Sequence, residues 1–336
     1  MSEILINRAA YLHNLTQISN KVGSKDRIIV ILKDNAYGHG ALQIAKLASE
    51  FGIKFACVRT MNEAQEIAEF FKNILILSHI PTGDEDLRFI YTINDISNLS
   101  VLKSGCKVHL GIDTLMHRNG LGEDELESAF EIASQRNIEI CGAFTHFRSS
   151  DETSAEYFVQ RENFAKAKAK IKALGAKFGL NLTFHSNNSA GIERATDFDD
   201  EFVRAGIAQH GYEQFNSSLS LKPVMSLWAD LVSKRFLKAG QSVGYGAKFT
   251  AKEDIQIATY DLGYGDGLLR YAGIGELKLA NGNLLLGKMS MDSFSTKYAG
   301  DRVCVFDDAR VWAEFFGTIS YDVLVKLSPI IKRTIV

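Results

Sequence analysis

The sequence has few cysteines, few prolines, no long hydrophobic run and no excess of one charge. Its four cysteines lie far apart and form no C-x-x-C pair, which argues against a zinc site or a disulfide framework and favours a reducing cytoplasm. A net charge of −2 with no basic cluster gives no electrostatic footprint for nucleic acid. The apolar runs are well short of the roughly 20 residues of a membrane span, and the N-terminus has no hydrophobic signal core. We therefore expect a cytoplasmic protein that binds neither nucleic acid, nor a membrane, nor a metal.

The most informative stretch runs from Arg27 to Gly40 and reads RIIVILKDNAYGHG. It begins with five apolar residues after the arginine, which predict a short strand buried on both faces of a parallel sheet. Lys33 follows at the C-terminal end of this strand, before a glycine-rich turn and an amphipathic helical pattern, ALQIAKLASEF. An amine at the mouth of an α/β sheet is suited to Schiff-base chemistry, although a solvated lysine at a strand end fits the same spacing.

Between residues 27 and 206, short β-branched runs alternate with amphipathic helical patterns. A capping box of Thr60 and Glu63 marks the start of one helix, and Gly175 is expected to end another, long one. Eight strands that alternate with helices predict a closed (β/α)8 barrel, an α/β fold of the TIM type, rather than an open sheet. The predicted strands are Arg27–Leu32, Lys54–Val58, Ile74–Ser78, Phe89–Ile93, Lys107–Ile112, Ile138–Phe144, Asn181–His185 and Glu201–Arg204.

After about Pro223 the helical periodicity fades. Short runs of β-forming residues separated by glycines replace it, and ANGN between two apolar runs predicts a hairpin turn. We expect a barrel domain over residues 11–222 and a smaller β-rich domain over residues 223–336. Residues 1–10 include the strand-like SEILINR, which we expect to pair with the second domain.

Polar side chains that could carry chemistry follow the ends of several predicted barrel strands. In such barrels the working residues lie at the C-terminal ends of the strands, and phosphate often binds after the last two. Each residue also has an ordinary interpretation: His146 as a structural histidine, Arg118 as a surface ion-pair former and Ser189 as a helix cap. Their shared position on one rim favours a site. The residues are Lys33, Arg118, His146, His185, Ser189 and Arg204.

The motifs along the chain resemble those of the alanine racemase family, which are pyridoxal-phosphate enzymes with a barrel and a β-domain (fold type III). KDNAYGHG resembles the family's pyridoxal-lysine signature at every position but one. HSNNSAG, VRAGIAQHG, VGYGAKF, LGYGDG and MSMDS match further family segments in the same order, so that the resemblance covers nearly the whole chain. It implies racemisation of L- and D-alanine with pyridoxal 5'-phosphate, supplying D-alanine for cell-wall synthesis.

The resemblance assigns contacts with the cofactor residue by residue. Lys33 matches the lysine that carries the cofactor, and Arg204 matches the arginine that faces its pyridine nitrogen. A permanently charged guanidinium should keep that nitrogen unprotonated, which weakens the electron sink and disfavours transamination. The other residues expected to bind the cofactor are Tyr37, His146, Ser189, Gly206, Ile207 and Tyr321.

Inversion of a stereocentre by proton transfer needs bases on two opposite faces of Cα. Lys33 would serve one face. Tyr245, in the C-terminal domain of the other subunit, would serve the second, so the resemblance implies an obligate homodimer with shared sites. Because a tyrosine with a reference pKa of about 10 is a poor base at neutral pH, His185 is expected to assist it through a hydrogen bond. The residues implied in substrate binding are Arg118, Tyr264, Met291 and Asp292.

The sequence departs from the family pattern at Gly111. The family usually has a lysine there, commonly carbamylated, which braces the arginine that Arg118 matches. Because a half-buried arginine is costly without a counter-charge, we expect a small anion such as chloride beside Gly111, with Asp113 as a competing brace.

Other functions fit the same fold. One is a racemase for serine, for a basic amino acid or for a broad range of substrates, because pocket volume and not motif decides the substrate. A basic amino-acid decarboxylase would place a reactive cysteine in the β-domain, whereas Cys304 lies in a plain strand-like run. A non-catalytic pyridoxal-phosphate carrier resembles the barrel alone, and the β-domain that bears Tyr245 argues against it.

Overall fold

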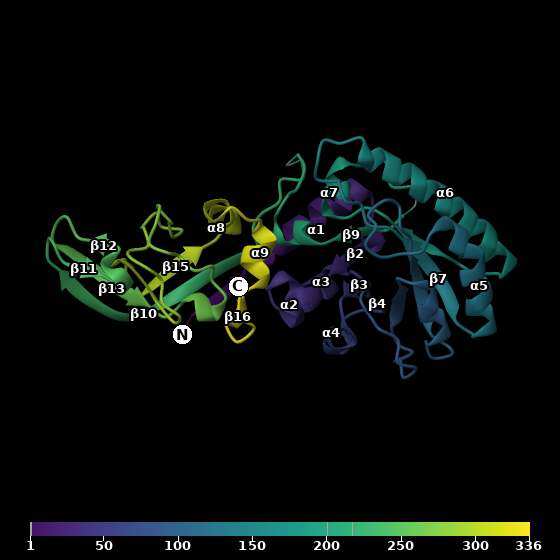
Figure 1. Cartoon of the computed structure of the whole chain (residues 1–336), viewed down its shortest axis with the longest axis horizontal. Helices are drawn as coiled ribbons and strands as arrows, with labels where there is room; N and C mark the ends of the chain where they lie inside the picture. Colours follow the sequence, from purple (N-terminus) through teal and green to yellow (C-terminus); the bar gives the residue numbers. More distant parts are fainter. Residues whose placement is uncertain (1, 200, 217) are drawn as a thin grey trace. The chain divides into compact units, whose positions relative to one another are not determined.

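The chain forms two compact units in the computed structural model, which describes residues 2–199, 201–216 and 218–336 (Figure 1). The barrel unit consists of Leu12–Asp34 and Ile44–Lys222. The C-terminal unit consists of the N-terminal segment that ends at Tyr11, Asn35–Gln43 and Pro223–Val336. The short segment that follows Lys33 therefore groups with the C-terminal part of the chain, although it lies within the predicted barrel range.

The barrel unit contains eight parallel strands, so that the predicted barrel is confirmed. Neighbouring strands pair in the order β8-β7-β6-β5-β4-β3-β2-β9, and an isolated parallel bridge between His185 and Phe202 links the two ends. The strands are short and almost wholly buried, which explains their near-continuous runs of Ile, Val and Leu. Their bounds are β2 (Ile28–Ile31), β3 (Phe55–Val58), β4 (Asn73–Ile76), β5 (Ile90–Ile93), β6 (Lys107–Gly111), β7 (Glu139–Phe144), β8 (Thr183–His185) and β9 (Val203–Ala205).

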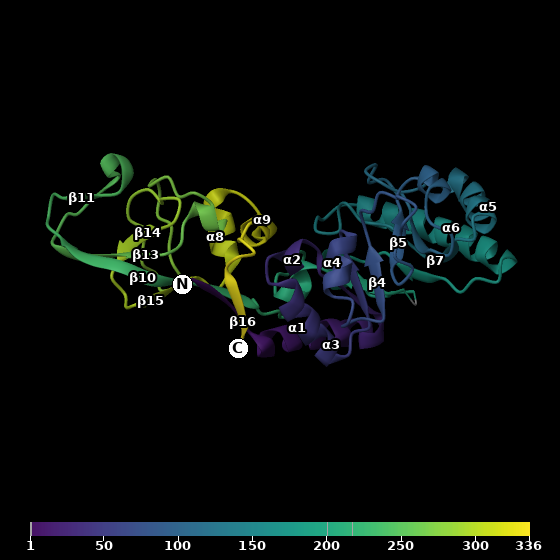
Figure 2. The same ribbon diagram turned by 90° about the horizontal axis from the view of Figure 1, so that it is seen from below.

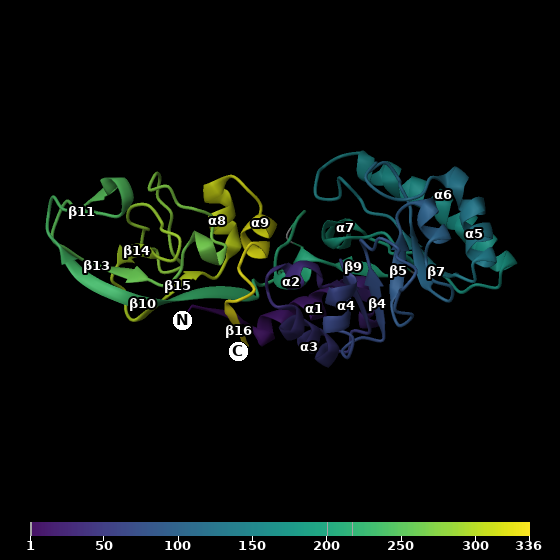
Figure 3. The same cartoon turned by 60° about the horizontal axis from the view of Figure 1, so that its bottom comes forward.

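Helices cover the outside of these strands, and α5 and α6 lie side by side in all three views (Figures 1, 2 and 3). The Thr60–Glu63 capping box is present at the start of α4. The expectation that Gly175 ends the long helix is wrong, because α6 continues to Lys177. A Cβ at Gly175 would approach Leu182 Cδ1 to 2.6 Å, so this glycine permits close packing of the helix. The helices are α1 (Arg8–Val22), α2 (Lys33–Tyr37), α3 (Ala41–Phe51), α4 (Met61–Glu66), α5 (Leu126–Gln135), α6 (Glu156–Lys177) and α7 (Ser189–Arg194).

The C-terminal unit is built on a sheet of six strands. Their order is β14-β13-β10-β1-β16, and β15 also pairs with β10. The N-terminal strand β1 is antiparallel to β10 and parallel to β16, so the two ends of the chain lie next to each other. Met1, at the start of the predicted range 1–10, lies outside the described residues. The strands are β1 (Glu3–Ile6), β10 (Met225–Leu237), β13 (Ile255–Tyr260), β14 (Phe294–Lys297), β15 (Arg302–Phe306) and β16 (Lys332–Ile335).

Smaller elements complete this unit. A hairpin of β11 (Ser242–Val243) and β12 (Phe249–Thr250) packs on a small apolar core that includes Leu237 and Leu286. At the predicted ANGN turn, an isolated bridge joins Lys278 to Leu284. Two helices that the sequence reading did not predict, α8 (Ala309–Phe316) and α9 (Ser320–Val325), follow β15. None of the described helices has the length and apolar character needed to cross a bilayer.

Candidate functional site

Lys33 opens α2, directly after β2, and this helix is left-handed. The four residues Asp34 to Tyr37 have φ between 51° and 55°. Because L-residues in a left-handed helix cost roughly 1–2 kcal/mol each, such a run persists only where its surroundings impose it. The sequence alone predicted a glycine-rich turn here, and the left-handed residues are not glycines.

Contacts on both sides hold this turn. In the barrel unit, the Asp34 N–H donates to Glu63 Oε1 (2.7 Å), an oxygen of the same carboxylate that caps α4. In the C-terminal unit, the Asn35 side chain accepts from the Ala41 N–H (2.8 Å), and Arg333 Nε donates to the Gly38 carbonyl (2.9 Å). A Cβ at Gly38 would overlap the Leu324 carbonyl oxygen, so only glycine allows this approach.

Arg204 lies at the centre of a buried hydrogen-bonded cluster at the C-terminal ends of β7, β8 and β9. Its guanidinium donates to His185 Nδ1 (2.9 Å) and to the carbonyl oxygens of Thr145 (2.8 Å) and Ser186 (3.1 Å). His146 Nδ1 lies 3.5 Å from the same group. Neutral acceptors thus hold the Arg204 guanidinium in place, and none of them neutralises its buried positive charge.

Burial and the nearby positive charges determine the protonation state of His146. Burial, and then the positive charges of Arg204, Arg118 and Lys33, lower its pKa to about 3. These three cations therefore lie within electrostatic reach of one imidazole, which is neutral at physiological pH. Together with His185, which is bonded to Arg204, the structure brings together five of the six predicted rim residues.

His185 does not fit the role that the sequence suggested for it. It is fully buried, stacks on Phe144 with ring centroids 4.8 Å apart, and bonds to Arg204 through Nδ1 and to His109 through Nε2 (2.9 Å). Both ring nitrogens are thus engaged inside the barrel unit, which leaves none to hydrogen-bond Tyr245. His146, which is half-buried beside Arg204, is the better candidate for that contact.

Ser189 and Gly206 are hydrogen-bonded to each other after the last two strands, and Ile207 follows Gly206 in the chain. Ser189 begins α7, and its Oγ accepts from the N–H groups of Gly206 (3.1 Å) and Ala208 (3.2 Å). Since the oxygen acts as the acceptor in both bonds, the Ser189 O–H stays available as a donor. A hydroxyl donor after the last two strands of a barrel could donate to a phosphate.

Arg118 is exposed, which corrects the expectation that it is half-buried. Within the part of the chain that the structure describes, it makes no ion pair. The Asp113 carboxylate instead accepts from the N–H groups of Leu115 and His117 and pairs with the His117 ring. A Cβ at Gly111 would face two oxygens, Ile93 O (3.2 Å) and Asn94 Oδ1 (3.4 Å), which does not favour the expected anion there.

The remaining predicted residues lie in the C-terminal unit. Tyr37, at the end of α2, packs edge-to-face on Tyr321 of α9, with centroids 5.6 Å apart. The Tyr264 segment packs against the next loop, where the Gly265 N–H donates to the Met291 carbonyl (2.8 Å). Met291 and Asp292 have exposed side chains.

Tyr245 projects from the connection between β11 and β12, and its side chain is 65% exposed. Gly244 and Gly246 on either side of it both have positive φ, so the glycines shape the tip that presents this ring. This exposure leaves the Tyr245 ring accessible for contact with another surface.

Sequence reasoning missed three residues that support the site: His109, Glu63 and Arg333. His109 occurs in an ordinary strand pattern, and Arg333 is 300 positions away from Lys33 in the chain. Glu63 was identified, but only as part of a capping box. Nothing in the local sequence of these residues signals their partners.

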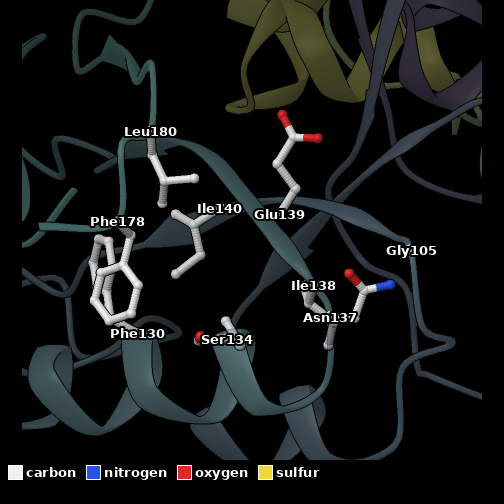
Figure 4. Close-up of a pocket in the computed structure, with 10 residues that line it drawn as sticks. Gly105, Phe130, Ser134, Asn137, Ile138, Glu139, Ile140, Phe178 and Leu180 are labelled. Atoms are coloured by element: carbon white, nitrogen blue, oxygen red, sulfur yellow. The ribbon is translucent and has the colours of Figure 1, made fainter. Parts of the chain in front are cut away.

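A separate cavity of about 310 Å³ lies in the barrel unit at the start of β7 (Figure 4). Its walls include Phe130, Phe178 and Ile140, and Glu139 stands beside it. Because β7 begins at Glu139, this cavity is at the opposite end of the strands from Lys33 and Arg204, and it is not part of the candidate site.

Comparisons with known proteins agree along the whole chain. Residues 6–214 match the family described as "Alanine racemase, N-terminal domain", and residues 224–335 match "Alanine racemase, C-terminal domain". The chain is 66% identical over 334 residues to the alanine racemase of Campylobacter concisus (strain 13826), with 99% of each chain covered. It is 52% identical over 336 residues to that of Campylobacter jejuni (strain RM1221), with 100% of each covered.

Solved structures share the fold. An alanine racemase of Clostridium difficile 630 superposes with a TM-score of 0.88 at 26% identity and covers 100% of this chain and 95% of its own. An alanine racemase from Bartonella henselae with covalently bound pyridoxal phosphate has a TM-score of 0.85 at 23% identity and covers 100% of this chain and 99% of its own.

Proposed function

The chain belongs to the alanine racemase family, and on that premise we propose that it interconverts L- and D-alanine with pyridoxal 5'-phosphate by a two-base mechanism. The observation that carries this proposal is the cluster in the barrel unit. There, Lys33 and Arg204 act on the same neutral imidazole, His146, at the rim where a serine hydroxyl and backbone N–H groups fit a phosphate.

The residues present fit the cofactor. Lys33 would hold it covalently, while Ser189, Gly206 and Ile207, together with Tyr37 and Tyr321, would bind its phosphate. When bound, pyridoxal phosphate draws electron density away from the substrate Cα and so makes the Cα proton acidic.

The chain's own groups would then move that proton. Once the substrate amine has displaced it from the cofactor, the free Lys33 Nζ would take this proton from, or return it to, one face of Cα. Arg204 is always charged and can only donate hydrogen bonds, so it holds the ring nitrogen as an acceptor. This limits the electron demand and favours return of the proton to Cα, which suits racemisation.

The second base is Tyr245 of the partner subunit in a homodimer. The 65% exposure of Tyr245 and the 54% exposure of Met291 support this assignment, because neither side chain finds a cover within its own unit. His146 would support the tyrosine through a hydrogen bond, since its pKa of about 3 keeps the imidazole neutral and able to accept one. Arg118, Tyr264, Met291 and Asp292 would line the substrate side.

Alanine is the proposed substrate, and supply of D-alanine for cell walls in the cytoplasm is the proposed role. The rival racemase for serine or a broader range of amino acids remains the alternative. The decarboxylase reading is weaker, because burial raises the pKa of the Cys304 thiol to about 12 and leaves it unreactive.

The test is turnover of L- and D-alanine, serine, lysine and arginine by the purified protein loaded with pyridoxal phosphate. Alanine should be racemised fastest in both directions. Borohydride reduction followed by peptide mass analysis should find the cofactor on Lys33. Cofactor binding without turnover of any amino acid would instead support a carrier, and a faster reaction with serine or lysine would support the rival racemase.

A further inference from the structure

His109 lies inside the barrel unit on β6, and the proposed mechanism does not use it. It is 1% exposed, and its ring packs edge-on against Phe55 with centroids 5.9 Å apart. Its Nδ1 lies 2.9 Å from His185 Nε2, so that Arg204, His185 and His109 form one hydrogen-bonded chain.

The donor at one end of this chain determines the direction of every bond. A guanidinium can only donate, so His185 Nδ1 must accept from Arg204. A neutral His185 then carries its proton on Nε2 and donates it to His109 Nδ1. His109 in turn carries its own proton on Nε2. Burial supports this arrangement, because it lowers the pKa of His109 to about 3 and that of His185 well below its usual value.

We propose that His109 is a positioning residue that fixes His185 as the Nε2–H tautomer and thereby holds the Arg204 guanidinium in its place. With the other tautomer, an N–H of His185 would point at an N–H of Arg204, and the arginine would have to move. The further step, that this fixes Arg204 against the pyridine nitrogen of the cofactor, rests on the proposed function.

Neighbouring residues make room for the His109 ring. A Cβ at Gly142, on the adjacent strand β7, would come within 2.5 Å of His109 Nε2. Phe144, on the same strand, stacks flat on His185, with an angle of 6° between the rings. The His109 ring thus fits into the space that Gly142 leaves, and the His185 ring is held against Phe144. This packing fixes the geometry of the hydrogen bond between the two imidazoles.

The first test measures the tautomers directly. Nitrogen NMR of cofactor-free protein labelled at histidine should show the proton of His185 on Nε2 and that of His109 on Nε2. Assignment by single substitution identifies each signal. A wild-type His185 with its proton on Nδ1 would overturn the proposal without any variant.

The second test compares two substitutions at the same position. His109→Leu removes the acceptor, whereas His109→Asn keeps an acceptor oxygen near the position of Nδ1. We expect His109→Leu to lose the single His185 tautomer and to weaken pyridoxal phosphate binding, measured by absorbance titration, about fivefold to tenfold, as for one buried hydrogen bond. His109→Asn should restore both towards the wild-type values.

Phe55→Leu serves as the matched control, because it removes packing from the same ring without touching a hydrogen bond. The proposal fails if His109→Leu keeps the wild-type tautomer, or if it weakens cofactor binding no more than Phe55→Leu does. Failure of the proposed function has a different signature: the wild-type protein would then bind no pyridoxal phosphate, while the NMR result on the cofactor-free protein would still decide the tautomer.

Discussion

The candidate residues around Arg204 in the barrel unit are buried and bonded to one another, whereas three of the six candidates in the C-terminal unit are exposed. Arg204 is 5% exposed and His185 is fully buried. Tyr245, Met291 and Asp292 are exposed, and Tyr245 stands on a two-strand hairpin. Under the proposed function, the Arg204 cluster is assembled within one chain, and the exposed residues of the C-terminal unit would be covered by the partner subunit. This difference is what a site shared between subunits would require.

The largest effect should come from Lys33, the proposed base in the barrel unit. Lys33→Ala removes the covalent anchor and one proton-transfer group, so racemisation in both directions should fall by about 10⁴-fold or more. A coupled assay for D-alanine and for L-alanine measures it. Lys54→Ala, which removes an exposed lysine paired with Asp26, is the control and should keep full activity. Retention of activity by Lys33→Ala would remove the basis of the proposed mechanism.

Tyr245→Phe tests the proposed base in the C-terminal unit. Cofactor binding should persist, while exchange of the Cα proton of one enantiomer with solvent deuterium should fall by about 10²- to 10⁴-fold. Proton NMR of alanine in D2O measures this exchange for each enantiomer. Normal racemisation in both directions would show that Tyr245 is not a base.

Mixing Lys33→Ala with Tyr245→Phe tests whether two subunits share one site. After subunit exchange, a hybrid of Lys33→Ala and Tyr245→Phe chains contains one site with both bases. If hybrids form at random, roughly a quarter of the wild-type activity should return, because half of the dimers carry one intact site. Absence of recovery in a mixture with proven hybrids would mean that each chain completes its own site.

Acid should weaken the barrel unit more than the C-terminal unit. Burial lowers the pKa of His109 and of His146 to about 3 in the folded chain, against 6.5 when unfolded, and lowers that of His185 well below its usual value, whereas the described part of the C-terminal unit has one such residue, His39 at about 4. The unfolded chain therefore binds more protons below pH 6.5, and stability is lost as the pH falls below that value. Each such histidine should contribute about 1 kcal/mol of loss per pH unit.

Urea unfolding between pH 7 and pH 5 measures this loss. His109→Leu should reduce the slope of the unfolding free energy against pH, and His117→Gln, at an exposed histidine, should leave it unchanged. A flat profile over this range would contradict the assignment of neutral buried histidines.

The smallest effect is expected at Gly111. Since this position has no amine to be carbamylated, and its edge is lined by the oxygens of Ile93 and Asn94, removal of carbon dioxide and bicarbonate should leave the rate unchanged. Exchange of chloride for a larger anion should also have no effect. A loss of activity on degassing that bicarbonate restores would show that another lysine is carbamylated.

The barrel was predictable because strands that are buried on both faces, such as Ile28–Ile31, are short runs of apolar residues, and such runs recur along the sequence. The site residues followed from their position after these strands and from motif resemblance. The left-handed turn from Asp34 to Tyr37 was not predictable, because Asp and Asn adopt positive φ only as single residues, Ala and Tyr do not favour it, and the run is held by Glu63 and Arg333 from afar. The partners of His185 were missed for the same reason, since hydrogen bonds across a barrel leave no local pattern.

The contact between Arg333 and Gly38 has a consequence for how the protein is made. The half-buried Arg333 lies on β16, which pairs with β1, and its guanidinium donates to the carbonyls of Gly38, Ser328, Pro329 and Ile331. On the ribosome, the turn beside Lys33 emerges about 300 residues before Arg333, an interval of roughly 15–60 s at bacterial elongation rates. During that interval the barrel strands can fold, but the lysine loop lacks its clamp. Under the proposed function, the turn beside Lys33 should therefore reach its cofactor-binding form only after Arg333 has left the ribosome.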